Sequence, residues 1–121
     1  MNERHKELKG QYKQMRPDMG IFKISAAGEA KAYLLATQDL KGSMNGALAR
    51  LRGGMHPNRE LQEAWTALGA ERFTAEVLER LPYDEKDEMK TDYSEELNIL
   101  EMLWTEKLEK ENVSLYQKRI G

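Results

Sequence analysis

The sequence predicts an α+β domain in which helices flank a small antiparallel sheet of about three strands. Two short apolar runs rich in β-branched and aromatic residues lie close together in the first third of the chain. Segments with apolar residues at helical spacing follow them, with one alternating polar and apolar stretch in between. The length of 121 residues fits one domain with a modest core, and we divide it into an N-terminal helical arm, 1–17, and a domain, 18–121.

Composition excludes several classes of protein and site. The chain has no cysteine, so it has no disulfide framework, no thiolate zinc site and no cysteine nucleophile. No apolar run approaches the roughly 20 residues that cross a bilayer. The first 13 residues are basic with only Leu8 and Tyr12 as large apolar side chains after Met1, which does not fit a secretory signal. We therefore expect a cytoplasmic protein without a membrane partner.

The first elements are an arm and a hairpin. Residues 3–14 have Leu8 and Tyr12 four positions apart among polar residues, which predicts a weakly amphipathic helix. Pro17 and Gly20 then interrupt the chain. The runs 20–24 and 32–36 predict two strands, and the short separation with a turn at 27–29 favours an antiparallel hairpin.

Two helices are predicted next. Thr37 or Asp39 can cap a helix that runs to about Arg52, although the glycines inside it cost about 1 kcal/mol each relative to alanine. Asn58 can cap the following helix, which Gly69 ends. The apolar stripes of the two helices are Leu40, Met44, Leu48 and Leu51 in the first, and Leu61, Trp65 and Leu68 in the second.

A third strand and a last helix complete the prediction. Residues 73–81 alternate well enough to predict a strand, and 84–92 form a charged loop. Ser94 opens a long helix, and the tail 113–120 forms either a short strand or irregular structure. The face that this helix buries consists of Leu97, Leu100, Trp104 and Leu108.

Glu101 is the acidic residue that this pattern singles out, because its spacing from Leu97 and Trp104 places a carboxylate on or beside the buried face. A buried carboxylate needs a cation, a hydrogen-bond donor or a metal ion. An ion pair with a base such as Arg50 and a metal site both remain open. Phosphate loops, paired metal-binding histidines and a serine elbow are absent from the sequence.

Charge is distributed unevenly along the chain. Residues 1–62 hold 11 basic and 6 acidic side chains, a balance of +5, whereas 63–121 hold 8 basic and 15 acidic ones, a balance of −7. Contacts with nucleic-acid phosphates are therefore expected mainly in the first half, with a solvated surface as the alternative. The expected contacts are Lys9, Lys13, Arg16, Lys41, Arg50, Arg52 and Arg59.

Several short motifs occur in an order that resembles the GIY-YIG nuclease family. They are Gly-Ile-Phe at 20–22, Tyr-Leu-Leu at 33–35, the stretch from His56 to Glu79, and Leu-Glu at 100–101 followed by Trp104 and Leu108. The resemblance covers about residues 18–112. It implies the family's fold and its reaction, hydrolysis of a nucleic-acid phosphodiester by water activated near a tyrosine, with an arginine and one metal ion.

The resemblance also assigns residues to the site. Tyr33 matches the tyrosine of the second motif, and Glu101 matches the glutamate that holds Mg²⁺ or Mn²⁺. Phe22 replaces the tyrosine of the first motif, and Ser43 stands where the family has its catalytic arginine. Serine cannot stabilise an anionic transition state as a guanidinium does.

Loss of one preorganised charge typically costs about 100- to 1000-fold in rate. We therefore predict a degenerate domain that binds nucleic acid, DNA rather than RNA, without efficient cleavage. One alternative is a slow metal-dependent endonuclease that uses Tyr33, Glu101 and a displaced base: Lys41, Arg50 or Arg52. Another is a scaffold with a protein partner, which the acidic second half favours. His56 is interpreted as a loop residue, and Trp65 and Trp104 as core.

Overall fold

A computed structural model describes residues 16–116 of the chain. Its elements in order are β1 (Met19–Ala26), β2 (Lys31–Thr37), α2 (Leu40–Arg52), α3 (Arg59–Leu68), the 3₁₀ turn η1 (Ala70–Arg72), β3 (Phe73–Leu81), α4 (Ser94–Lys110) and β4 (Ser114–Leu115). The predicted α+β class is confirmed. The expected arm, apart from residues 16 and 17, lies outside the described residues, as do Lys9 and Lys13.

The strands form one sheet in the order β3-β1-β2-β4. β1 pairs antiparallel with both β2 and β3, so the predicted hairpin is present at the centre of the sheet. After α4 the chain returns and forms β4, the short strand that the sequence left open as one of two alternatives for the tail. β4 lies parallel to β2 at Lys31 and Ala32, so the sheet is mixed and not antiparallel throughout as predicted. In the described part of the chain, no strand pairs with the rest of that edge of β2.

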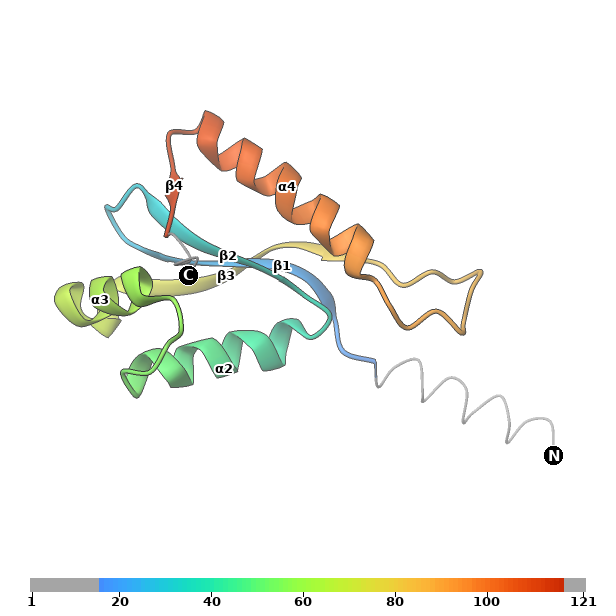
Figure 1. The fold of residues 1–121 in the computed structure, drawn as a ribbon, viewed down its shortest axis with the longest axis horizontal. Helices are drawn as coiled ribbons and strands as arrows, with labels where there is room; N and C mark the ends of the chain where they lie inside the picture. The colour runs from blue at the N-terminus through green and yellow to red at the C-terminus, as the bar shows by residue number, and fades with distance from the viewer. Residues whose placement is uncertain (1–15, 117–121) are drawn as a thin grey trace.

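Helices cover both faces of the sheet (Figure 1): α4 lies on one face, and α2 and α3 lie on the other. Side chains that alternate along β1 and β2 therefore enter two different cores. Ile21 and Leu34 pack with Leu100 and Leu108 under α4. The larger core on the other face contains Phe22, Ile24, Tyr33, Leu40, Leu51, Leu61, Trp65 and Phe73. Trp104, predicted as core, is only half-buried: it packs against the core under α4, and its indole N–H donates to the exposed Glu79 carboxylate at 2.9 Å.

The helix starts agree with the sequence prediction. The Asp39 side chain accepts a hydrogen bond from the Gly42 N–H and caps α2, and Asn58 accepts one from the Leu61 N–H and caps α3. Gly69, at φ +96°, ends α3. Among the described residues, the structure has no helix that combines the length and the apolar content needed to cross a membrane.

Gly20 makes a close contact possible between β1 and β3. Its φ is +155°, and a Cβ atom there would lie 2.1 Å from the Glu79 carbonyl oxygen. The register of the two strands shifts immediately afterwards, between Ile21 and Phe22. A glycine is thus required where the strands approach and the pairing changes.

Candidate functional site

The candidate site lies beside the unpaired edge of β2. Tyr33, on this strand, is 8% exposed, and its ring contacts the His56 ring edge-on, with 5.1 Å between the centroids. No hydrogen bond to the Tyr33 hydroxyl occurs within residues 16–116, and no buried polar side-chain atom there lacks a partner. The hydroxyl therefore reaches solvent while the ring is held in the core.

His56 is held rigidly in the segment between α2 and α3. Its Nδ1 accepts a hydrogen bond from the Asn58 N–H at 3.0 Å, and its own N–H donates to the Gln62 side chain at 2.9 Å. Burial, together with the positive charge of Arg50, lowers the pKa of His56. The imidazole is therefore neutral near pH 7, with its proton on Nε2, because Nδ1 acts as an acceptor.

Arg50 lies in the last turn of α2 with an exposed side chain. Within the described residues it forms no ion pair. It follows Ser43 by seven residues, so the two share one helix face and are separated by about 10.5 Å along the axis. A guanidinium on this face is thus present two turns beyond the position at which the family resemblance places it.

The electrostatics of Tyr33 show which charges lie around its hydroxyl. Burial raises the pKa of Tyr33, the positive charge of Arg50 lowers it, and the negative charge of Glu101 raises it; the net shift is upward. The phenol is therefore protonated at neutral pH. Arg50 from α2 and Glu101 from α4 both act on this one group, which places the four side chains of Tyr33, Arg50, His56 and Glu101 in one neighbourhood.

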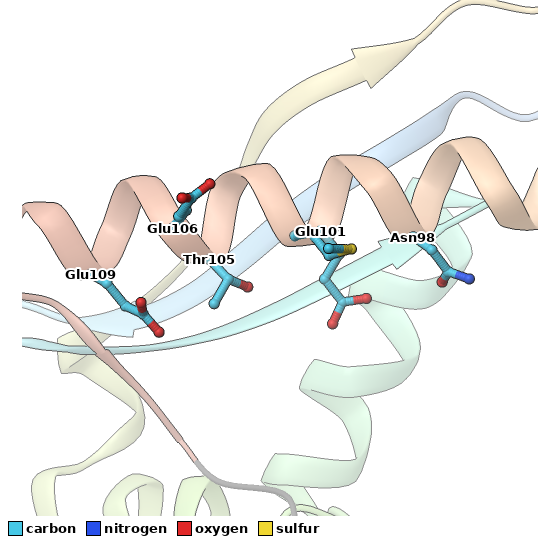
Figure 2. A pocket seen from close by; sticks show the side chains of 6 residues that line it. Asn98, Glu101, Thr105, Glu106 and Glu109 are labelled. Atoms are coloured by element: carbon cyan, nitrogen blue, oxygen red, sulfur yellow. The ribbon is translucent and has the colours of Figure 1, made fainter.

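Glu101 is half-buried on α4 and makes no hydrogen bond or ion pair within the described part of the chain. The internal pair with Arg50 that the sequence left open is not formed. Figure 2 shows that Glu101 points to the side of α4 that faces β2 and α2. It lines an open hollow of about 690 Å³ together with Asn98, Met102, Thr105, Glu106 and Glu109.

These residues fit a hydrated divalent cation better than a closed metal cage. No group of three histidine, cysteine or acidic side chains that could hold a metal ion occurs in residues 16–116. Glu101 supplies one unpaired carboxylate beside open space. Mg²⁺ is commonly held by one or two carboxylates while it keeps several waters, and Mn²⁺ takes the same oxygen ligands.

Two residues that the resemblance assigned to the site belong to the scaffold. Phe22 is completely buried in the core under α2 and α3. The Ser43 hydroxyl forms a 2.6 Å hydrogen bond with the Thr37 hydroxyl, and its N–H donates to the Asp39 carbonyl in the first turn of α2. Neither side chain offers a charge to a substrate.

The predicted phosphate contacts are not gathered in one patch. Arg50, Arg52 and Arg59 lie exposed at the end of α2 and the start of α3, on the segment that also carries His56. Lys41 and Arg16 line a different hollow, near the start of α2. Arg16 lies over the Tyr83 ring and donates to the Glu88 carbonyl at 3.3 Å.

His56 lies in the loop between α2 and α3, as predicted, but the prediction did not include its burial against Tyr33. A histidine before proline reads as an ordinary loop residue, and its burial depends on packing against Tyr33, far away in sequence. The sequence signal that could have indicated an ordered histidine is Asn58, the helix cap two residues later. Asn58 fixes the start of α3, and its N–H then fixes the tautomer of His56.

Comparisons with known proteins bear on the fold. No family model matches the sequence, and no curated protein matches it. The structure is similar to that of the catalytic domain of homing endonuclease I-TevI, with a TM-score of 0.65 and 20% identity over 84% of this chain and 99% of that one. A mutant of the catalytic domain of intron endonuclease I-TevI gives a TM-score of 0.58 and 21% identity over 86% and 96%.

Both of these structures contain the catalytic domain of a GIY-YIG nuclease. They cover 84% and 86% of this chain, and at this level of identity the likeness concerns the fold. The chain therefore has the fold of the GIY-YIG nuclease family.

Proposed function

We propose that the protein is a divalent-metal-dependent endonuclease that hydrolyses nucleic-acid phosphodiesters. Its catalytic arginine is Arg50, two helical turns beyond Ser43, the position to which the family resemblance assigns this residue. The observation that carries this proposal is that the Tyr33 ring is held against His56, with 5.1 Å between the centroids, while its hydroxyl reaches solvent. The charges of Arg50 and Glu101, which act on the pKa of this phenol in opposite directions, support it. The fold supports the same reaction class, because both similar structures are catalytic domains of endonucleases. DNA is the first substrate to test, with RNA as the second.

Each side chain has a chemical role in this proposal. The Tyr33 hydroxyl, solvent-facing and protonated at neutral pH, orients the attacking water by accepting a hydrogen bond from it, and the proton that this water loses passes to bulk solvent. Arg50 is exposed and forms no ion pair within residues 16–116, so its guanidinium is available to hold a non-bridging phosphate oxygen and to stabilise the charge that develops there. The neutral His56 donates from Nε2 to a second phosphate oxygen.

Glu101 is the residue that would hold the metal ion. A divalent cation, when bound there, supplies Lewis-acid polarisation of the phosphate and stabilises the leaving oxygen. Glu101 forms no ion pair with any described residue, which supports this role, since an internal ion pair would have to be broken first.

A second function, binding without cleavage, is favoured by the state of Ser43. Its hydroxyl is committed to Thr37, and Phe22 has no hydroxyl at all, so two groups expected for efficient catalysis are absent. This candidate predicts salt-dependent binding of nucleic acid with no metal-dependent nicking.

Nicking of supercoiled plasmid with and without Mg²⁺ or Mn²⁺ distinguishes the two. The endonuclease proposal predicts slow, metal-dependent nicking that Glu101→Gln abolishes, with binding retained. Binding that weakens with salt while the plasmid stays intact would instead establish the binding function. Absence of both would direct attention to a protein partner.

A further inference from the structure

The side of α4 that carries Glu101 also carries two neutral polar side chains. Asn98 precedes Glu101 by three residues and Thr105 follows it by four, so all three lie on one helix face. Figure 2 shows their oxygen-bearing groups on the same side, facing β2 and α2, with Glu109 further along. All four residues line the same hollow.

Neither neutral side chain is used within the protein. Asn98 is exposed and Thr105 is half-buried, and within the described residues neither makes a side-chain hydrogen bond. An amide and a hydroxyl that flank an unpaired carboxylate offer hydrogen-bond donors and acceptors at the distance of one helical turn on either side. The helical spacing brings these groups to one face, and the core does not use them, since the buried side chains of α4 are Leu97, Leu100 and Leu108.

We propose that Asn98 and Thr105 form the outer shell of a hydrated divalent-cation site centred on Glu101. This inference rests on the proposed function, because it assumes that Glu101 holds a metal ion. A cation held by one carboxylate keeps most of its waters, and those waters need hydrogen-bond partners on the protein. The two side chains are positioning residues that hold the water shell and do not touch the metal.

Glu109 provides an internal comparison. It points to the same side as Glu101 but follows it by eight residues, about 12 Å along the helix axis. In about 0.1 M salt, the condition for the test, one charge at that distance changes the affinity for a divalent cation by less than about twofold. A purely electrostatic attraction by the acidic helix can thus be separated from specific contacts at Asn98 and Thr105.

The test is binding of Mn²⁺ alone to the full chain, followed by the electron paramagnetic resonance signal of free Mn²⁺. Outer-shell substitutions typically weaken metal binding 10- to 100-fold, and we expect about 10-fold for both Asn98→Ala and Thr105→Val. Thr105→Ser keeps the hydroxyl and should restore affinity, Glu109→Gln should stay within about twofold, and Glu101→Gln should abolish saturable binding. Circular dichroism checks that each variant is folded.

The outcomes separate this inference from the proposed function. Loss at Glu101→Gln, with Asn98→Ala and Thr105→Val both within twofold of the wild type, would overturn the outer shell and leave the Glu101 metal site standing. If Glu109→Gln and Thr105→Val weaken Mn²⁺ binding equally, the ion is held only by the overall negative charge of α4, and the outer shell is overturned. Absence of saturable Mn²⁺ binding in the wild type would also overturn the inference, and plasmid nicking would then judge the proposed function separately.

Discussion

Replacing Arg50 by alanine should slow plasmid nicking about 100- to 1000-fold, equivalent to about 2.7–4 kcal/mol of transition-state stabilisation. The reason is that Arg50 is the arginine on the Ser43 face of α2 and the base whose charge acts on both Tyr33 and His56. The family resemblance assigns the arginine to the position of Ser43, whose hydroxyl forms a hydrogen bond with Thr37. No guanidinium therefore lies at that position.

The fold should survive this substitution. Arg50 is exposed and forms no ion pair within the described residues, so its main contribution to stability is the interaction of its charge with the C-terminal end of α2. That interaction contributes about 0.3–1 kcal/mol. The same charge effect applies to Arg52, which also lies in the last turn of α2 and is exposed. Arg52→Ala is therefore the matched control.

The assay is single-turnover nicking of supercoiled DNA by wild type, Arg50→Ala, Arg50→Lys and Arg52→Ala at saturating metal. Lysine keeps the charge but not the two-pronged geometry, so Arg50→Lys should fall between wild type and Arg50→Ala. Binding across a salt series should show a slope reduced by about 0.9 for one lost phosphate contact with duplex DNA. The reasoning is refuted if Arg50→Ala nicks at a rate within threefold of wild type while Glu101→Gln is inactive.

Three further predictions follow from the same geometry. Moving the guanidinium back, with Ser43→Arg added to Arg50→Ala, should recover part of the nicking lost in the single variant, and no recovery would show that the two positions do not serve one phosphate. Because folding lowers the pKa of His56, the unfolded chain binds a proton at this histidine at higher pH than the folded chain does. The free energy of unfolding, measured in urea, should therefore fall as the pH drops below about 6.5, and this fall should disappear in His56→Gln. The same pH profile in the variant and the wild type would contradict the buried neutral imidazole. Gly20→Ala should destabilise the fold by at least about 2 kcal/mol, because the new Cβ would meet the Glu79 carbonyl. Gly46→Ala, in open space on α2, should stabilise the fold by about 0.5–1 kcal/mol in the same urea denaturation assay. Equal effects of the two substitutions would argue against the close approach of β1 and β3.

Local features of the fold were predictable from the sequence. The β-branched and aromatic runs gave the central hairpin, and Asp39, Asn58 and Gly69 marked helix ends through side-chain capping and backbone freedom that act over a few residues. The pairing of β4 with β2 could not be predicted, since it depends on where α4 returns the chain. A short strand in the tail was one of two alternatives that the sequence left open, because two residues have too little pattern to decide between a strand and irregular structure.

The candidate site was predictable only in part. Tyr33 and Glu101 were identified from the order of motifs, and Arg50 only as one of several bases on a helix. Their convergence depends on how α2 and α4, which cover opposite faces of the sheet (Figure 1), are placed relative to β2. His56 is part of the candidate site because its ring contacts Tyr33, which lies on a distant segment of the chain. No local sequence pattern indicates such a contact.

The most direct test of the convergence of Arg50 and Glu101 on Tyr33 is the pKa of the Tyr33 phenol, measured by ¹³C NMR of labelled tyrosine and assigned with Tyr33→Phe. Removing the positive charge in Arg50→Ala should raise this pKa further, and removing the negative charge in Glu101→Gln should lower it. Arg52→Ala should leave it unchanged. Shifts of opposite sign in the first two variants would establish the shared neighbourhood, whereas an unchanged Tyr33 pKa in both would contradict it.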